Sequence, residues 1–417
     1  MTTTTSNIDI AVIGAGIIGV ACAYKLTEAG RSVVLIDRKG VAEETSRGNA
    51  GAFAFSDIMP LATKDVLKKL PRWLTDPLGP FTVRPEYLPQ IAPWMVRFWR
   101  AGWPDRVAAG IKAQAEMMRL ARRETESLVA SAGLQHMVRS DGVLELYESE
   151  AEIRAAQHEL DAKTAEGIEH RLVRGAELAE LQPGLAPSII AATFIPKWQT
   201  VSDPYDYTTA VAQAAMARGA QFRKGEVARL DPLEAGVIVT FADGSKLTAA
   251  HVVVAGGAWS RALTAPLGDL IPLETERGYN TTLPEGAFDL RRQLVFGGHG
   301  FVVTPLSHGV RVGGAVELGG LKLPPNFKRA DAMLTKAARL MPGLKTSGGK
   351  QWMGFRPSLP DSLPAIGRSR PSPRIVYAFG HGHLGLTQSA AAGRLVTDVV
   401  TGATPSLDLA PFSPQRF

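Results

Sequence analysis

The sequence predicts an α/β fold, in which a domain with a parallel sheet is interleaved with an α+β domain that contains an antiparallel sheet. A strand, a glycine turn and a helix follow one another at the start of the chain and again near its end, which predicts the first domain. Closely spaced short strands between residues 293 and 316 predict the second, because such strands usually pair as a meander. For 417 residues we expect two domains.

The amino-terminal unit begins with an apolar run at 8–13, which we expect to form a strand. Gly14, Gly16 and Gly19 follow it in the spacing of a dinucleotide-binding turn. Gly14 would make the turn, Gly16 would let the backbone approach a pyrophosphate, and Gly19 would let the next helix lie close to the strand. The phosphates would face the helix N-terminus.

An acidic residue completes this unit. The second strand, 31–36, runs into Asp37, whose carboxylate suits the hydroxyls of an adenosine ribose. The order of strand, turn, helix, strand and acid predicts a Rossmann-type dinucleotide site, although the turn alone leaves FAD and NAD(P) both open. We place Ile17, Ile18, Arg38 and Val227 in the same site.

Three further segments are small, polar or rich in glycine, so their backbone amides can approach a flat cofactor. Their candidate residues are Ser46, Asn49, Ala50 and Gly51; then Gly256, Gly257 and Trp259; and finally Gly382, His383, Leu384, Gly385, Leu386 and Thr387. The last segment precedes a helix expected at 388–400, whose positive end would stabilise a group that becomes negative. Each segment could instead be an ordinary turn, and His381 and His383 could be packed loop residues.

Arg356 lies in the sequence Gly-Phe-Arg-Pro, between residues that restrict the backbone. A guanidinium held in this way offers a planar fork of two donors, which suits a substrate carboxylate. The alternative is a surface arginine in a turn.

Four of the seven tryptophans, Trp73, Trp94, Trp99 and Trp103, lie in the segment 61–106 together with prolines and basic residues. Such a segment resembles an interfacial surface, where indole rings lie at the level of lipid headgroups. The alternative is a helical region, broken by proline, that packs on its own domain. Farther along, the pattern predicts helices at 111–130, 151–180 and 204–218, the last capped by Asp203.

Composition excludes several classes of protein. The net charge of +6 is small for this length, and the basic residues are dispersed, so we expect no nucleic-acid partner. Cys22 is the one cysteine, which excludes an internal disulfide; we expect no metal site and a reducing, cytoplasmic location. The leader before residue 10 has no Lys or Arg, unlike a signal peptide, and no apolar run is long enough to span a membrane. Peripheral contact with the inner face of the cytoplasmic membrane stays open.

Taken together, these motifs resemble the D-amino-acid oxidase superfamily over essentially the full chain, and most closely its bacterial D-amino-acid dehydrogenases, including hydroxy-D-proline dehydrogenases. The resemblance implies FAD, and because no cysteine occurs late in the chain, FAD held noncovalently. It also implies an FAD-binding domain made of residues 1–60, 174–262 and 350–417, and a substrate-binding domain made of 61–173 and 263–349.

The resemblance further implies that a D-amino acid, such as D-proline or hydroxy-D-proline, passes a hydride from its α-carbon to flavin N5. Arg356 would clamp the α-carboxylate, Tyr279 would donate its hydroxyl to the same group, and His383 would lie near the flavin. The electrons would pass to a quinone or another carrier. Two alternatives stay open: an amine oxidase of the glycine or sarcosine oxidase type that uses O2, and a flavin subunit that only relays electrons.

Overall fold

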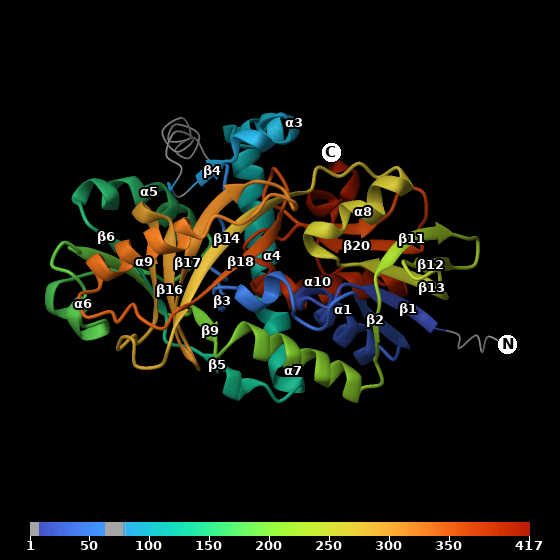
Figure 1. The fold of residues 1–417 in the computed structure, drawn as a ribbon, viewed down its shortest axis with the longest axis horizontal. Coiled ribbons are helices and arrows are strands. Elements are labelled where there is room, and N and C mark those ends of the chain that lie inside the picture. The colour runs from blue at the N-terminus through green and yellow to red at the C-terminus, as the bar shows by residue number, and fades with distance from the viewer. Residues whose placement is uncertain (1–7, 63–77, 80) are drawn as a thin grey trace.

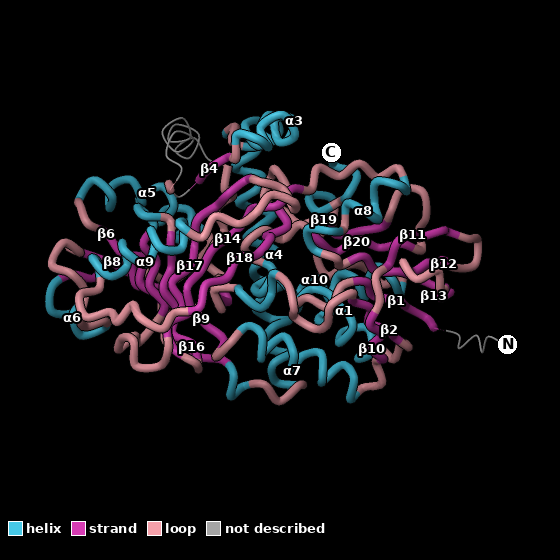
Figure 2. Tube along the Cα trace, viewed as in Figure 1, coloured by secondary structure: helices cyan, strands magenta, loops and turns pink. Residues whose placement is uncertain are grey.

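A computed structural model describes residues 8–62, 78–79 and 81–417 of the chain. Two large β-sheets lie side by side along its long axis, with helices packed around them (Figure 1, Figure 2). One sheet has a parallel centre, and the other is mainly antiparallel. The α/β class with an added antiparallel sheet, predicted from the sequence, is therefore confirmed.

The first sheet has eight strands in the order β10-β2-β1-β13-β12-β11, with β20 beside β13 and β19 beside β20. These strands are β1 (Ile8–Ile13), β2 (Val33–Asp37), β10 (Gln221–Lys224), β11 (Val227–Pro232), β12 (Val237–Phe241), β13 (Lys246–Val254), β19 (Ala365–Arg368) and β20 (Ile375–Phe379). In the parallel part, Ile13 pairs with Ile36 on one side and with Val254 on the other. The turn after β1, the acid that ends β2 and the glycines after β13 therefore meet at one edge of the sheet.

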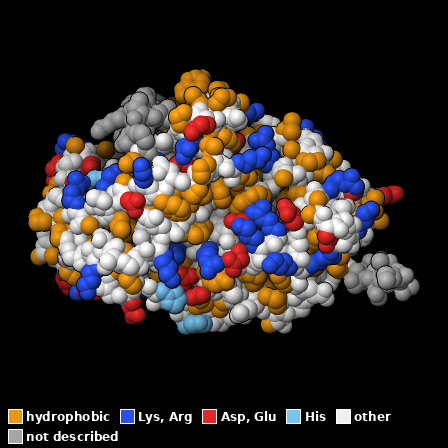
Figure 3. Space-filling view, in the orientation of Figure 1, with side chains coloured by type: hydrophobic (Ala, Val, Ile, Leu, Met, Phe, Trp, Pro, Cys, Tyr) orange, Lys and Arg blue, Asp and Glu red, His pale blue; other side chains and the backbone are white. Residues whose placement is uncertain are grey.

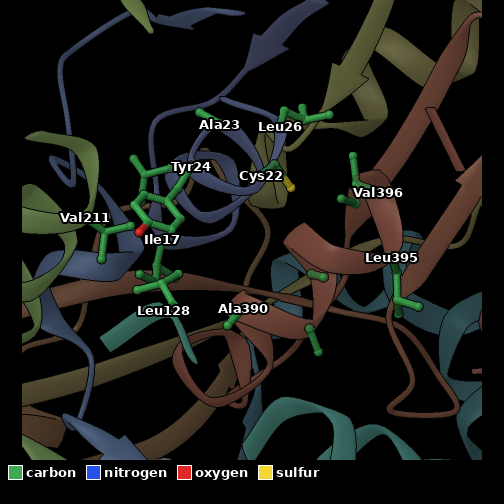
Figure 4. Close-up of a cluster of buried hydrophobic side chains, with 14 of the residues drawn as sticks. Ile17, Cys22, Ala23, Tyr24, Leu26, Leu128, Val211, Ala390, Leu395 and Val396 are labelled. Carbon is green, nitrogen blue, oxygen red and sulfur yellow. The ribbon is translucent and has the colours of Figure 1, made fainter. Parts of the chain in front are cut away.

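Helices α1 (Ile17–Glu28), α4 (Pro104–Ser131), α7 (Pro204–Ala217) and α10 (Gly385–Thr401) build the core beside this sheet. Figure 4 shows side chains of this buried cluster, with Ile17, Leu128 and Val211 beside Tyr24, which is fully buried. Helix α10 approaches α1 closely, because a Cβ at Gly393 would lie 2.6 Å from the carbonyl oxygen of Ala21. Burial of this apolar surface holds the two glycine turns together, at roughly 25 cal/mol per Å² of area removed from water.

The second sheet has nine strands in the order β18-β14-β17-β16-β15-β6-β8-β7, with β4 beside β17. These strands are β4 (Phe81–Val83), β6 (Val143–Tyr147), β7 (Arg171–Arg174), β8 (Ala191–Ile195), β14 (Glu274–Leu283), β15 (Gln293–Phe296), β16 (Phe301–Leu306), β17 (Gly309–Leu318) and β18 (Lys350–Ser358). The predicted meander is confirmed as β15, β16 and β17. Strand β14 was not predicted, because its sequence is polar on both faces.

The remaining elements connect and cover the two sheets. A small third sheet contains β3 (Ala52–Phe53), β9 (Gln199–Val201) and β5 (Val138–Arg139), and the other helices are α3 (Leu88–Ala101), α5 (Glu150–Ala165), α6 (Gly175–Leu181), α8 (Arg261–Thr264) and α9 (Lys328–Leu340). The Asp203 carboxylate accepts hydrogen bonds from the amides of Tyr205 and Asp206 at 2.7 and 3.2 Å, so the predicted cap of α7 is confirmed.

Three predicted helices differ from those observed. The helix expected at 151–180 ends at Ala165, because Gly167 takes a left-handed conformation and residues 171–174 pair with β8 as a strand. The helix expected at 111–130 already begins at Pro104, a favoured residue for a first turn. The last helix begins at Gly385, three residues before its predicted start.

The predicted division into domains stays a prediction, but the strand pairing shows where two of its segments join the other sheet. Residues 174–262 and 350–417 were assigned to the cofactor domain, yet β8 pairs with β6 and β7, and β18 pairs with β14. Both strands therefore belong to the antiparallel sheet. This difference arises because the sheet that a strand joins is decided by the strands it pairs with, and these can lie far away in the sequence.

Candidate active site

A cavity of about 730 Å³ is lined by residues from both sheets. Of the predicted cofactor residues, all but two line it: Gly14, Gly16, Ile17, Ile18, Asp37, Arg38, Ser46, Asn49, Ala50, Val227, Gly256, Gly257, Trp259, Gly382, His383, Leu384, Gly385, Leu386 and Thr387. Gly19 lies behind the turn, where a Cβ would be 1.7 Å from the Gly14 carbonyl oxygen, and Gly51 lies behind its loop. The folded chain therefore brings segments that are far apart in the sequence to one cavity.

The first glycine turn has no room for side chains. Gly14 has φ +106°, and a Cβ there would lie 2.4 Å from the carbonyl oxygen of Ala255. Asp37 Oδ2 accepts a hydrogen bond from the Ala15 amide at 2.9 Å, and Ser46 Oγ accepts one from the Ile17 amide at 2.9 Å. The turn is thus held between the end of β2 and the loop that follows it.

The second glycine turn presents two histidines in different states. His381 is buried, and neither ring nitrogen has a hydrogen-bond partner among the described residues. Burial lowers the pKa of His381 to about 3, so its ring is neutral at physiological pH. His383 Nε2 lies 3.1 Å from Asp57 Oδ2. Burial lowers the pKa of His383, but the hydrogen bond and charge of Asp57 outweigh it, and the net pKa is raised.

Helix α10 begins directly after these histidines. The first amides of a helix have no intrahelical acceptor, and Gly385, Leu386 and Thr387 of this first turn line the cavity. The positive end of the helix and His383, whose pKa is raised, therefore lie at the same part of the cavity.

One face of the antiparallel sheet forms the opposite wall. Across β14 and β18, Glu276 pairs with Arg356, Gly278 with Gly354 and Asn280 with Trp352. Alternate residues of a strand point to the same face, and all six of these residues line the cavity. The intervening residues point to the other face.

Arg356 lies over Gly278, where a Cβ would be 2.4 Å from its Nη2 atom. Its guanidinium donates to the carbonyl oxygens of Ala315 at 2.8 Å and Gly314 at 3.4 Å. In the described part of the chain it forms no ion pair. Burial lowers the pKa of Arg356, while the charge of Glu276 opposes this shift. Arg356 is thus a cation in the cavity wall with donors left for an anion.

Tyr279 is the residue whose hydroxyl we expect to reach the same carboxylate as Arg356. Its ring lies in the apolar core behind the sheet, with its hydroxyl donating to Glu317 Oε1 at 3.0 Å and accepting from the Asn326 amide at 3.0 Å. The residue is one position out of phase with Gly278, so its side chain points to the face opposite Arg356. Tyr279 is among the residues that line the cavity, but its hydroxyl is held by Glu317 and Asn326 and does not lie beside Arg356. A role for Tyr279 toward the substrate stays a prediction.

Several residues in the cavity wall were missed from the sequence, notably Asp57, Glu276 and Asn280. Asp57 follows no recognisable motif, and its partner His383 is 326 residues away. Glu276 precedes an Arg-Gly-Tyr segment in a strand that was not predicted, so its alternation with Gly278 gave no usable signal.

No group of three or more His, Cys, Asp or Glu side chains that could hold a metal ion occurs among the described residues. None of the helices in the described ranges has the length and apolarity needed to cross a bilayer. Burial raises the pKa of the Cys22 thiol, within α1, to about 12.

The sequence is similar to curated proteins over nearly its whole length. It is 34% identical to a D-amino-acid oxidase of Bradyrhizobium diazoefficiens over 417 residues, covering 98% of each chain. It is 30% identical to a D-amino acid dehydrogenase of Rhizobium johnstonii, covering 98% of this chain and 99% of that protein.

Solved structures share the fold at lower sequence identity. Glycine oxidase from Geobacillus kaustophilus superposes with a TM-score of 0.75 at 23% identity, covering 99% of both chains. L-proline dehydrogenase from P. horikoshii superposes with a TM-score of 0.76 at 21% identity, covering 99% of this chain and 98% of the other. Residues 9–399 also match the family model DAO, described as FAD dependent oxidoreductase. The chain belongs to this family of FAD-dependent oxidoreductases.

Proposed function

We propose that this protein is a dehydrogenase that oxidises a D-amino acid with noncovalently bound FAD and passes the electrons to a quinone or another carrier. The observation that carries the proposal is Arg356, a guanidinium that forms no ion pair with any described residue and lies in the wall of the cavity that the glycine turns line. A carboxylate is the planar acceptor that such a fork binds in two-point geometry.

The residues of the cavity fit FAD. Gly14 and Gly16 leave bare backbone at the N-terminus of α1, where a pyrophosphate binds. Asp37 is placed for the ribose, since carboxylate oxygens have lone pairs beyond those used by backbone amides. Noncovalent binding is supported by the position of Cys22, which is buried in the helical core and absent from the cavity wall.

The chain's own groups would orient the substrate and complement the cofactor. Arg356 would fix the carboxylate so that the α C–H bond points at the flavin, and positioning of this kind lowers barriers by several kcal/mol. FAD, when bound, supplies the acceptor for the hydride. The first turn of α10 would hold positive charge beside the ring system, and His383, whose pKa is raised by Asp57, would add to it when protonated.

The preference for D-amino acids is supported by the names of the curated relatives, a D-amino-acid oxidase and a D-amino acid dehydrogenase. One structural neighbour is an L-proline dehydrogenase, which is named for a cyclic amino acid. We therefore include D-proline and hydroxy-D-proline among the proposed substrates. No side chain of the cavity selects a ring by itself.

Anaerobic reduction tests the proposal directly. We expect a D-amino acid to bleach the visible absorption band of the bound flavin, whereas its L-enantiomer leaves the band unchanged. A screen of D- and L-amino acids that includes proline and hydroxyproline would give the substrate class. A flavin that no amino acid reduces would instead favour an electron-relay subunit and contradict the proposal.

An oxidase that uses O2, of the glycine or sarcosine oxidase type, is the second candidate, because a glycine oxidase shares the fold. Peroxide formed at the rate of substrate oxidation in air-saturated buffer would establish it. Oxidation that depends on an added quinone would support the dehydrogenase.

Helix α3 supports a peripheral site on the inner face of the cytoplasmic membrane. Ile91, Trp94 and Phe98 pack inward, while Trp99 and Trp103 are 53% and 41% exposed. Figure 3 shows apolar side chains at the top of the molecule, where this helix lies. Indole rings of this kind bind at the headgroup level of bilayers. Trp73, predicted to take part, lies outside the described residues.

Vesicle binding tests this part of the proposal. The wild-type protein should sediment with vesicles that contain anionic phospholipid, and replacing Trp99 and Trp103 with alanine should lower the bound fraction. Activity with a soluble acceptor should stay unchanged, because neither residue lines the cavity. Equal binding by both proteins would contradict a membrane role for α3.

A further inference from the structure

A second charge without a partner lies beside Arg356. Glu276 is 3% exposed and lines the same cavity. Within the described ranges its carboxylate takes part in no hydrogen bond and no ion pair, and its oxygens are not among the buried atoms that lack a partner. They therefore open onto the cavity, where a ligand can reach them.

The neighbouring carboxylate on the same strand shows the contrast. Glu274 points to the same face two residues earlier and is also buried, but it accepts a hydrogen bond from the Tyr87 hydroxyl at 2.8 Å and lies outside the cavity wall. The absence of a partner among the described residues is therefore a property of Glu276 and not of the strand as a whole.

The cationic side chains around Glu276 have other partners, so its carboxylate can bind a cationic group of a ligand. Arg356 faces it from β18, and His383 faces it from the turn before α10. His383 is already held by Asp57 at 3.1 Å. Under the proposed function, Arg356 is neutralised by the α-carboxylate of the substrate. Asp57 and the substrate carboxylate would then engage His383 and Arg356, and Lys163 binds Glu145 and Glu159 at 2.7 and 2.8 Å. Beside Arg356, the Glu276 carboxylate is left free to bind a cationic group.

We propose that Glu276 binds the amino group of the substrate, so that Arg356 and Glu276 together recognise the two charged groups of an amino-acid zwitterion. The inference rests on the proposed role of Arg356. Paired residues of antiparallel strands have Cβ atoms about 4.5–5.5 Å apart, so the two side chains start close together on one face. The carboxylate and ammonium groups of an α-amino acid are bonded to the same carbon, so they lie close together. Arg356 and Glu276 are also close together and carry the opposite charges, so each can bind one of these groups. Glu276 would thereby make the site prefer amino acids over carboxylates that have no amino group.

Two ligands that cannot lose a hydride test this role without turnover. In 2-aminoisobutyrate the α-carbon bears no hydrogen, and pivalate has the same shape with a methyl group in place of the ammonium. Titration of the flavin spectrum of the holoenzyme gives their dissociation constants. We expect the wild-type protein to bind 2-aminoisobutyrate at least about tenfold more tightly, as a hydrogen bond between charged groups implies.

Glu276→Gln should abolish this preference without weakening pivalate, whereas Glu274→Gln should keep the preference. If Glu276→Gln does not retain flavin, the wild-type protein still provides a test, because 2-hydroxyisobutyrate should bind less tightly than the amine. A preference that survives in Glu276→Gln, or a wild-type protein that binds all three ligands equally, would overturn the role of Glu276 and leave Arg356 intact. A wild-type protein that binds none of them would refute the carboxylate site itself, and this inference with it.

Discussion

Replacing Arg356 with alanine should raise KM for the amino acid by roughly 30- to 3,000-fold, while FAD stays bound. Loss of one partner of a desolvated, hydrogen-bonded charge pair costs about 2–5 kcal/mol, and about 1.4 kcal/mol corresponds to a factor of ten. Arg356 faces the cavity from β18 and, among the residues that the structure describes, donates only to the carbonyl oxygens of β17. Steady-state kinetics, with the flavin spectrum as a measure of cofactor content, check this expectation.

Two further variants distinguish the loss of geometry from the loss of charge. Arg356→Lys keeps the cation but not the planar fork, so its KM should lie between those of the wild type and of Arg356→Ala. Gly278→Ala keeps the arginine and displaces it, because the new Cβ would lie 2.4 Å from Nη2. A KM that none of the three substitutions changes would remove Arg356 from the substrate site.

Gly14→Ala should yield protein without flavin. The residue has φ +106°, and the added Cβ would lie 2.4 Å from a backbone oxygen, that of Ala255, which cannot rotate away. The turn would have to move from the end of β13, and the amides at the start of α1 would no longer face the pyrophosphate. Absorbance measures the bound flavin, and far-UV circular dichroism shows whether the sheets and helices are retained.

Gly30→Ala is the matched control for this prediction. Gly30 also has a positive φ, +74°, but nothing lies within 4 Å of a Cβ there. The control should lose about 1–2 kcal/mol of stability, because an L-residue is strained in the left-handed region, and it should purify with its normal flavin content. A Gly14→Ala protein that is as yellow as the wild type would show that the amino-terminal turn does not hold the cofactor.

The cofactor cavity could be predicted from the sequence because each of its segments is a local pattern. Gly14, Gly16 and Asp37 lie within one strand-turn-helix-strand unit, and the turn at 380–387 repeats the same order. Such patterns record what one short stretch of backbone requires: a positive φ, room for a close approach, or an acid at a strand end. These local requirements do not depend on how the rest of the chain folds.

In the cavity wall formed by the antiparallel sheet, a residue was predicted only where a short motif pointed to it. Gly-Phe-Arg-Pro identified Arg356, whereas the face to which Tyr279 points could not be inferred, because β14 was not predicted as a strand. Shifting a strand by one position turns every side chain to the opposite face. The long strand β14 has a polar sequence without alternation, so its register could not be inferred from the residues alone.

By itself, then, the sequence determined the α/β class, the glycine turns and the arginine suited to a carboxylate, because short-range spacing encodes them. Only the tertiary structure decided that Glu276 stands opposite Arg356, that Asp57 holds His383, and that β8 and β18 join the antiparallel sheet. These relations depend on which strands pair and in what register. That choice is made by the packing of the whole chain, over sequence separations that no local pattern spans.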